Sequence, residues 1–287
     1  MSLTMPPRTG DGGGARDPAA LAGHSAHPRR VGFFTDTTVC IGCKACEVAC
    51  KTWNEVPDDG FTLTGMSYDN TGALGASTWR HVAFVEQPRP DGFRWLMSSD
   101  VCKHCTSAAC LDVCPTGALV RTEFGTVVVQ QDVCNGCGYC VPACPFGVID
   151  KREDDGRVWK CTLCYDRLRV GEEPACAKAC PTSSIQFGDL DDLRSRARER
   201  VDELHARGVD DAYLYLADED DGIGGAGAFF LLLDEPEVYG LPPDPVTTTR
   251  DVGAMWRSAA LTGAALVLAA AAAFVPGLRR LAPKGPR

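Results

Sequence analysis

The chain has 287 residues, of which 45% are hydrophobic and 23% are charged, a composition that permits one large globular domain or two small ones. Its net charge of -9 at pH 7, without a run of Lys or Arg in the region expected to fold, disfavours nucleic acid as a partner. Sixteen cysteines are far more than a soluble enzyme of this size normally carries, so they must have a specific role.

The first segment, residues 1–30, is rich in Gly, Pro, Ala and isolated charges. It contains no apolar run that would form the core of a signal peptide. Such a composition cannot bury enough apolar surface to order itself, so we predict a mobile tail.

The cysteines that follow form four quartets, which are variants of one motif. The first and third quartets have the spacing C-x2-C-x2-C-x3-C, the second widens the middle gap to four residues, and the fourth widens it to eleven. A proline follows each of the last three quartets. In chain order the quartets are Cys40, Cys43, Cys46 and Cys50; Cys102, Cys105, Cys110 and Cys114; Cys134, Cys137, Cys140 and Cys144; and Cys161, Cys164, Cys176 and Cys180.

This spacing is typical of [4Fe-4S] clusters. Soft thiolates suit iron and sulfide, and three cysteines in one tight loop can bind three irons of a cubane. In two-cluster ferredoxins the fourth thiolate binds the neighbouring cluster, so four quartets predict four clusters in pairs. Gly42, Gly136 and Gly138 lie between ligands, where they let backbone N–H groups approach the negative cluster.

Two other roles for the cysteines are weaker. Disulfides explain an even number of cysteines outside the cytoplasm, but repeated tight spacings with a trailing proline make a poor disulfide framework. Structural zinc explains single C-x2-C pairs, yet zinc sites usually join two distant pairs rather than four tight quartets. Iron-sulfur binding is therefore the favoured interpretation.

Between the quartets the pattern predicts hairpins. Strand-like stretches at residues 79–86 and 92–97 flank a Pro-rich turn and predict a hairpin insertion. Residues 118–121 and 126–129 flank Glu123-Phe124-Gly125 and predict a second, short hairpin, which makes quartets two and three one ferredoxin-like unit.

After the fourth quartet, apolar residues recur at helical spacing from Asp189 to a stop at Gly208, which predicts an amphipathic helix. Residues 213–217 and 228–233 then predict two paired strands. The loop between them has the spacing G-x-G-x-x-G at Gly222, Gly224 and Gly227. A nucleotide is not expected there, because the dinucleotide motif needs a strand before it and a helix after it.

Several residues close to the quartets are candidates for a supporting role. His104 lies inside the second quartet, but all four cysteines are present without it, so we expect it near a cluster or in solvent rather than as a ligand. Lys44, Lys103 and Lys160 adjoin cysteines, where a positive charge raises a cluster's reduction potential; ordinary surface lysine is the alternative. For Trp53 we expect core packing.

Near the C-terminus, residues 258–278 carry no charge until Arg279. About 21 residues at about 1.5 Å each span roughly 30 Å, the thickness of a bilayer's hydrocarbon core. We predict one transmembrane anchor rather than an Ala-rich helix buried in protein.

On these motifs the sequence resembles the iron-sulfur (beta) subunits of membrane-bound respiratory formate dehydrogenases. The likeness covers most of the chain, and the stretches that carry it are residues 34–36 with 40–46, 134–144, 160–164 with 171–180, 222–225 and 239–242. The related iron-sulfur subunits of dimethyl sulfoxide and polysulfide reductases share the quartets but generally lack the terminal span.

The resemblance implies an α+β fold with two pseudo-symmetric two-cluster ferredoxin-like units, hairpin insertions and one C-terminal transmembrane helix. We expect a four-cluster body at residues 31–188, a helix and strand extension packing on it at 189–250, an anchor at 251–278 and a basic tail at 279–287. The resemblance also pairs quartet one with four and quartet two with three. The implied ligand sets are Cys40, Cys43, Cys46 and Cys180; Cys161, Cys164, Cys176 and Cys50; Cys102, Cys105, Cys110 and Cys144; and Cys134, Cys137, Cys140 and Cys114.

The implied function is electron transfer without substrate chemistry in this chain, since no triad, carboxylate pair or open metal site is visible. Electrons from formate oxidation at a molybdenum or tungsten pterin site in a separate alpha subunit would pass to a membrane cytochrome b (gamma) subunit and quinone. The alternatives are the same relay for a hydrogenase or another molybdopterin oxidoreductase, and a zinc-binding structural anchor without redox activity.

The charges that flank the predicted span indicate its orientation. Positive residues without acids follow it, whereas both signs precede it, so we expect a cytoplasmic C-terminus and a cluster domain on the outer side of the plasma membrane. The flanking residues are Arg279, Arg280, Lys284 and Arg287 after the span, and Asp244, Arg250, Asp251 and Arg257 before it. A cluster domain on that side would be exported folded with a partner that carries a twin-arginine signal; the alternative is a cluster domain in the cytoplasm.

Overall fold

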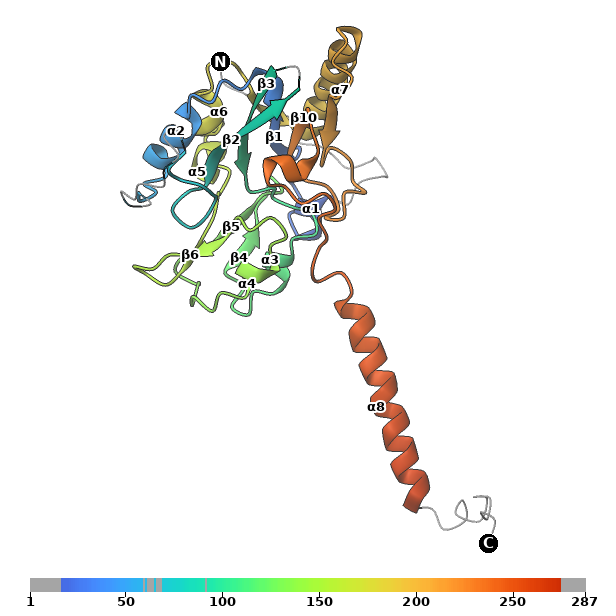
Figure 1. The fold of residues 1–287 in the computed structure, drawn as a ribbon. Coiled ribbons are helices and arrows are strands. Elements are labelled where there is room, and N and C mark those ends of the chain that lie inside the picture. The colour runs from blue at the N-terminus through green and yellow to red at the C-terminus, as the bar shows by residue number, and fades with distance from the viewer. Residues whose placement is uncertain (1–16, 59, 61–64, 66–68, 91, 275–287) are drawn as a thin grey trace. The chain divides into compact units, whose positions relative to one another are not determined.

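The computed structural model describes residues 17–58, 60, 65, 69–90 and 92–274 (Figure 1). Its contacts divide the chain into two units, Met1–Thr247 and Thr248–Arg287. Each unit is described by itself. The first contains the sheet and all sixteen cysteines, and the second contains one long helix.

A four-stranded sheet with the order β8-β1-β10-β9 lies at the centre of the first unit. Its central strands are β1 (Val31–Asp36) and β10 (Ala228–Leu232), which run parallel with Phe33 opposite Ala228. The edge strands β8 (Ile185–Asp189) and β9 (Tyr213–Tyr215) pair antiparallel with β1 and β10. Every residue of β1 and β10 is buried, as expected for strands that are covered on both faces. The predicted pairing of 213–217 with 228–233 is confirmed.

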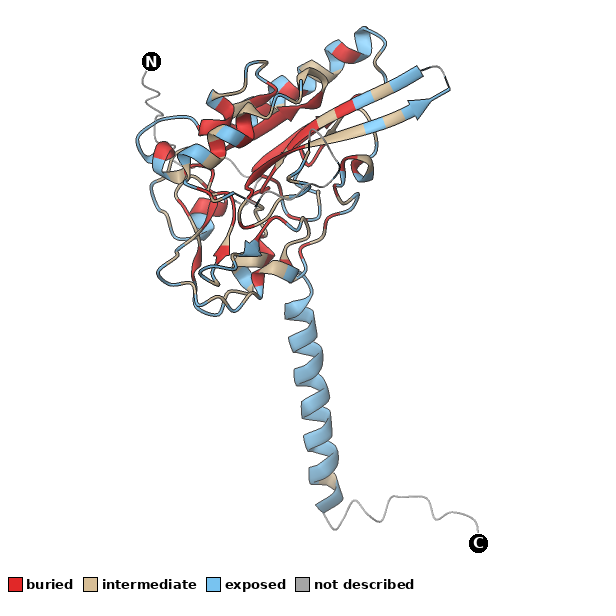
Figure 2. Cartoon of the chain, turned by 60° about the vertical axis from the view of Figure 1, so that its left-hand side comes forward, coloured by how far each residue is buried: buried red, intermediate tan, exposed pale blue. Residues whose placement is uncertain are grey.

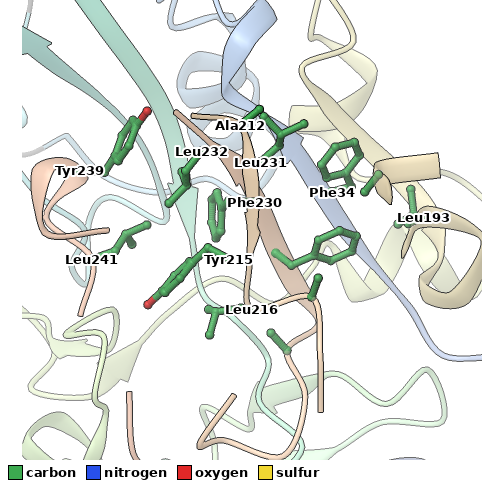
Figure 3. Packing of buried hydrophobic residues seen from close by; sticks show 14 of the residues in the cluster. Phe34, Leu193, Ala212, Tyr215, Leu216, Phe230, Leu231, Leu232, Tyr239 and Leu241 are labelled. Carbon is green, nitrogen blue, oxygen red and sulfur yellow. The ribbon is translucent and has the colours of Figure 1, made fainter. Parts of the chain in front are cut away.

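Helix α7 (Leu190–Ala206) begins directly after β8 and packs against β1. The Asp189 carboxylate caps it by accepting hydrogen bonds from the N–H groups of Asp191 and Asp192, at 3.0 and 3.2 Å. Leu193 and Ala197 are fully buried on its apolar face, and Figure 3 shows Leu193 beside Phe34 of β1. The predicted amphipathic helix is therefore confirmed.

Three hairpins extend from this framework. The longest pairs β2 (Arg80–Arg89) with β3 (Gly92–Val101), and its base is buried while its far end is exposed (Figure 2). The second pairs β4 (Leu119–Arg121) with β5 (Val127–Val129), and both of these hairpins confirm the predictions. A third hairpin, β6 (Asp150–Lys151) with β7 (Val158–Trp159), was not predicted, because each strand has only two residues.

Short helices carry or follow the cysteine motifs. They are α2 (Ala45–Trp53), α3 (Ala109–Asp112), α4 (Cys140–Ala143), α5 (Tyr165–Arg169) and α6 (Ala175–Lys178). Two 3-10 segments, η1 (Thr37–Val39) and η2 (Pro236–Tyr239), follow β1 and β10. The cysteines thus lie on short, tightly curved segments between the strands.

Residues 17–30 differ from the expected mobile tail. They include a short helix, α1 (Pro18–Leu21), which Asp17 caps. The Arg30 side chain donates hydrogen bonds to the Thr106 hydroxyl at 2.8 Å and to the His104 carbonyl at 3.0 Å, and Arg29 pairs with Asp189 at 2.8 Å. These polar partners lie in the folded body, so the composition of residues 17–30 could not indicate that the segment is ordered. Residues 1–16 lie outside the described residues.

The expected division between a body at 31–188 and an extension at 189–250 is also different in the structure. Strands β9 and β10 come from the extension, yet β10 lies inside the sheet next to β1. The extension is therefore part of the same hydrophobic core rather than a layer added to it.

The second unit contains α8 (Val252–Phe274), whose side chains are almost all exposed (Figure 2). Within the described part of the chain it is the one helix that is long and apolar enough to cross a membrane, judged by length and composition. It begins before the predicted span of 258–278. Residues 275–278 and the basic tail at 279–287 lie outside the described residues.

Candidate iron-sulfur sites

The sixteen cysteines are all free thiols, and the structure groups them across the quartets. One cavity is lined by Cys40, Cys43 and Cys46 of the first quartet together with Cys180 of the fourth. A second cavity is lined by Cys102, Cys105 and Cys110 of the second quartet together with Cys144 of the third. We name these sets the first group and the third group.

The other eight cysteines are related in the same crossed way. Cys50 lies close enough to Cys161, Cys176 and Cys164 for their charges to add to burial in raising the Cys50 pKa well above its ordinary value. Burial and the charges of Cys114, Cys137 and Cys134 likewise raise the pKa of Cys140 to about 11. We name Cys50, Cys161, Cys164 and Cys176 the second group, and Cys114, Cys134, Cys137 and Cys140 the fourth group.

These groups suit a polynuclear cluster better than a single ion. Burial raises the pKa of Cys46 to about 11 and that of Cys110 to about 12, so crowded thiols of this kind would keep their protons unless a cation bound them. Among the described residues, no three His, Cys, Asp or Glu side chains converge closely enough to hold one metal ion. A set of four thiolates fits the donor set of an iron-sulfur cubane.

The loops that carry the first three cysteines of a motif contain left-handed residues. Gly42 has φ 64° and Lys44 has φ 57° in the first motif, and His104 has φ 44° in the second. Such conformations turn successive N–H groups toward one side and create an anion-binding concavity. Gly42 also needs to lack a side chain, because a Cβ atom there would lie 2.6 Å from the Phe84 ring and 2.7 Å from Met97 Sδ of the long hairpin.

Three cations are fully buried beside the thiol groups. Lys103 Nζ pairs with Asp100 and lies 5.0 Å from the ring centroids of both Phe146 and Phe230. Lys160 Nζ donates hydrogen bonds to the carbonyls of Val127 and Cys161. These two lysines are therefore not the surface residues of the alternative interpretation. Lys44 is only partly buried and pairs with Asp69 at 3.1 Å and Glu47 at 3.2 Å.

The third buried cation, Arg80, was not identified from the sequence. It begins β2, and its Nη2 atom lies 3.4 Å from Cys176 Sγ. No cysteine lies near it in the sequence, so only the folding of the hairpin onto the thiols brings it there.

His104 is buried beside the third group, which excludes the solvated alternative. Its Nδ1 atom accepts a hydrogen bond from the Val127 N–H at 3.1 Å. Burial, with the nearby charges of Lys160, Arg121 and Arg30, holds the His104 pKa well below its ordinary value. The ring is therefore neutral and carries its proton on Nε2, which has no hydrogen-bond partner among the described residues.

For Trp53 the prediction of core packing was wrong. The side chain is 46% exposed, its Nε1–H donates a hydrogen bond to Asp166 at 2.8 Å, and the Arg167 guanidinium lies 4.2 Å from the ring centroid. The indole is amphipathic, so it can lie at the surface while its N–H is satisfied by a carboxylate.

The glycines of the G-x-G-x-x-G spacing allow a close approach to the second cysteine motif. A Cβ atom at Gly224 would lie 2.8 Å from Ser107 Oγ, and one at Gly227 would lie 3.1 Å from His104 Cβ. The Thr106 N–H donates to the Gly225 carbonyl at 3.0 Å, and the Ser107 N–H donates to the Ile223 carbonyl at 2.8 Å. This loop therefore holds the backbone that carries Cys105.

Comparisons with known proteins agree with this geometry. Two family models, both described as a 4Fe-4S dicluster domain, match residues 39–118 and 93–190. The formate dehydrogenase-O iron-sulfur subunit of Escherichia coli is 42% identical over 84% of this chain and 81% of its own length. The formate dehydrogenase iron-sulfur subunit of Haemophilus influenzae is 41% identical over 84% of this chain and 79% of its own. The B subunit of the anaerobic dimethyl sulfoxide reductase of Escherichia coli is 38% identical over 58% of this chain and 76% of its own.

Proposed function

We propose that this chain, which belongs to the family of formate dehydrogenase iron-sulfur subunits, holds four [4Fe-4S] clusters and relays electrons from a catalytic subunit to the membrane. The observation that carries the proposal is the arrangement of sixteen free thiols in four crossed groups. Two matching dicluster models support the cluster type.

Each of the four cysteine groups is the proposed ligand set of one cluster. The first and second groups exchange the last cysteine of quartets one and four, and the third and fourth groups exchange that of quartets two and three. This is the exchange expected of two pseudo-symmetric two-cluster units.

Proximity between neighbouring groups supports a linear order for the relay. Burial and the charge of Cys176 of the second group raise the pKa of Cys46 of the first. Burial and the charge of Cys102 of the third group raise the pKa of Cys161 of the second, and burial and the charge of Cys140 of the fourth group raise the pKa of Cys110 of the third. The proposed order is therefore first, second, third, fourth.

The two ends of this order are open to solvent. Cys43 in the first group and Cys137 in the fourth are exposed, whereas the second group has Cys50, Cys161, Cys164 and Cys176 all buried. An electron can enter or leave where a cluster approaches the surface, so the end groups are the proposed contact points for partner subunits.

The proposed electron donor is a molybdopterin-containing alpha subunit with molybdenum or tungsten. Oxidation of formate yields CO₂, one proton and two electrons, and the clusters would pass these electrons one at a time. The proposed acceptor is a cytochrome b gamma subunit that reduces quinone with two electrons and two protons. Formate dehydrogenase subunits match 84% of the sequence and the dimethyl sulfoxide reductase subunit 58%, which favours formate over other substrates of molybdopterin enzymes.

Helix α8 is the proposed anchor in the plasma membrane. Its length and apolar composition support a single span. The positive residues that follow it in the sequence support a cytoplasmic C-terminus, with the cluster unit on the outer side.

Anaerobic purification of the native complex from membranes tests the proposal. We expect about 16 irons and a matching amount of acid-labile sulfide per chain, a co-purifying pterin subunit, and reduction of the clusters by formate. Reduction by hydrogen instead of formate would identify a hydrogenase relay. Zinc without sulfide would establish a structural anchor and overturn the proposal.

A further inference from the structure

Arg80 lies at the base of the long hairpin with a side chain that is only 1% exposed. Its Nη1 atom donates hydrogen bonds to the carbonyl and the hydroxyl of Ser99, at 3.2 and 3.4 Å. Its Nη2 atom lies 3.4 Å from Cys176 Sγ, and the guanidinium lies 4.6 Å from the centroid of the Phe33 ring. The cation is thus held rigidly against a thiol of the second group.

No carboxylate forms an ion pair with Arg80 among the described residues. By contrast, Lys103 pairs with Asp100 and Arg167 pairs with Glu172. A buried charge without a counter-charge is strongly destabilising, so the negative charge that balances Arg80 has to come from elsewhere.

The thiolates supply that charge. The Arg80 Nη2 atom lies 3.4 Å from Cys176 Sγ of the second group. The Ser99 hydroxyl, which accepts a hydrogen bond from Arg80 Nη1, lies 3.4 Å from Cys46 Sγ of the first group. Arg80 therefore contacts the second group directly and the first group through Ser99.

We propose that Arg80 is a shared counter-ion of the first two clusters and raises the reduction potential of both. Adding an electron to a cluster adds one negative charge, and a fixed positive charge nearby stabilises the reduced form. The effect is strong here because the site is dry. This inference rests on the proposed ligand sets, but it does not depend on which catalytic subunit supplies the electrons.

The competing explanation is purely structural. Arg80 also joins β2 to Ser99 of β3 and covers the Phe33 ring, so it could serve only to hold the hairpin in place. Arg80→Lys keeps the positive charge but loses the planar fork of donors, whereas Arg80→Gln loses the charge and keeps some hydrogen bonding. Comparing the Lys and Gln variants therefore separates the effect of the positive charge from the effect of the hydrogen bonds that hold the hairpin.

The test is a potentiometric titration of the complete complex, in which electron paramagnetic resonance monitors the signal of each cluster. In Arg80→Gln we expect two of the four midpoint potentials to fall while the other two stay unchanged, and we expect Arg80→Lys to restore both. Arg94→Gln is the matched control, because Arg94 lies on the same hairpin but pairs with Asp234 at 3.5 Å and Asp211 at 3.8 Å. It should change none of the potentials.

Unchanged potentials in Arg80→Gln, or an equal shift of all four, would overturn the proposal. If Arg80→Gln fails to assemble clusters, the Arg80→Lys variant distinguishes a need for positive charge from a structural role. Native iron content and native potentials in Arg80→Lys would support a need for charge, and failure of Arg80→Lys as well would establish the structural role instead. Iron and sulfide content of the unmodified complex tests the cluster proposal separately, so the two failures are distinguishable.

Discussion

Gly32 on β1 lies so close to Gly227 that a Cβ atom at position 32 would be 2.1 Å from the Gly227 carbonyl oxygen. The same Cβ atom would be 2.6 Å from Leu190 Cδ2 at the start of α7. The next residue, Phe33, accordingly donates its N–H to Gly227 at 2.9 Å. The parallel pairing of β1 with the β10 segment therefore depends on the absence of a side chain at residue 32.

Gly32→Ala should destabilise the first unit by about 1–3 kcal/mol, the usual cost of overpacking a filled core. The measurement is the midpoint of thermal unfolding at a fixed scan rate, detected as the loss of cluster absorbance. Gly75→Ala is the control, because the nearest atom to its added Cβ is Asp150 Oδ2 at 3.9 Å. Equal midpoints for the two variants would contradict this account of the strand pairing.

Loss of the last cysteine in a quartet should damage the partner cluster. Cys50→Ala is expected to lower the iron content from about 16 to about 12 per chain and to remove the same resonance as Cys164→Ala. Cys43→Ala should remove a different resonance, since Cys43 lines the cavity of the first group. If Cys50→Ala and Cys43→Ala abolished the same signal, the crossed ligand sets would be wrong.

His104 should have two separable effects. His104→Phe leaves the buried Val127 N–H without its acceptor, at a cost of about 1–3 kcal/mol. It also removes the Nε2–H donor beside the third group, which should lower one reduction potential. His104→Asn tolerates the left-handed backbone and has an oxygen near the Nδ1 position, so we expect it to recover stability without recovering the potential. Unfolding and potentiometry of both variants provide the test, and recovery of both properties by Asn would argue against an Nε2 donor.

A charge in the middle of α8 should weaken membrane attachment. Leu266→Arg is expected to cost about 2.5–3.5 kcal/mol of insertion free energy. The measurement is the share of the chain that stays in washed membranes when it is expressed without its partner subunits. Val170→Arg is the control, since Val170 is an exposed aliphatic residue of the first unit. Equal retention of the two variants would be inconsistent with a spanning helix.

Local patterns predicted the β2–β3 and β4–β5 hairpins and α7, because their signals lie within one short window. The strands of the long hairpin and the pairing of β9 with β10 follow from alternation and turn residues close to them. The parallel pairing of Phe33 with Ala228 could not be predicted in this way, because nothing near either residue identifies a partner so distant in sequence.

The cysteine spacing predicted the cluster type, which the dicluster models support, but it could not predict which other side chains lie beside the thiols. Arg80 carries no local sign of its role, since its contact with Cys176 exists only after the hairpin folds. The order of residues 17–30 also depends on distant partners, as Arg30 contacts Thr106 and His104. The composition of a segment indicates whether it can become ordered by itself, but it contains no information about contacts with distant residues.

The pairing of β1 with β10 constrains how the protein matures during synthesis. The first quartet leaves the ribosome long before Cys180, which completes its group, and before β10, which completes the sheet behind it. Contacts so distant in sequence form slowly, and a chain released from the N-terminus cannot make them until its last strand emerges. The thiols of the first quartet are therefore exposed to oxidants until Cys180 completes their group, whereas the third and fourth groups are complete once Cys144 has been translated.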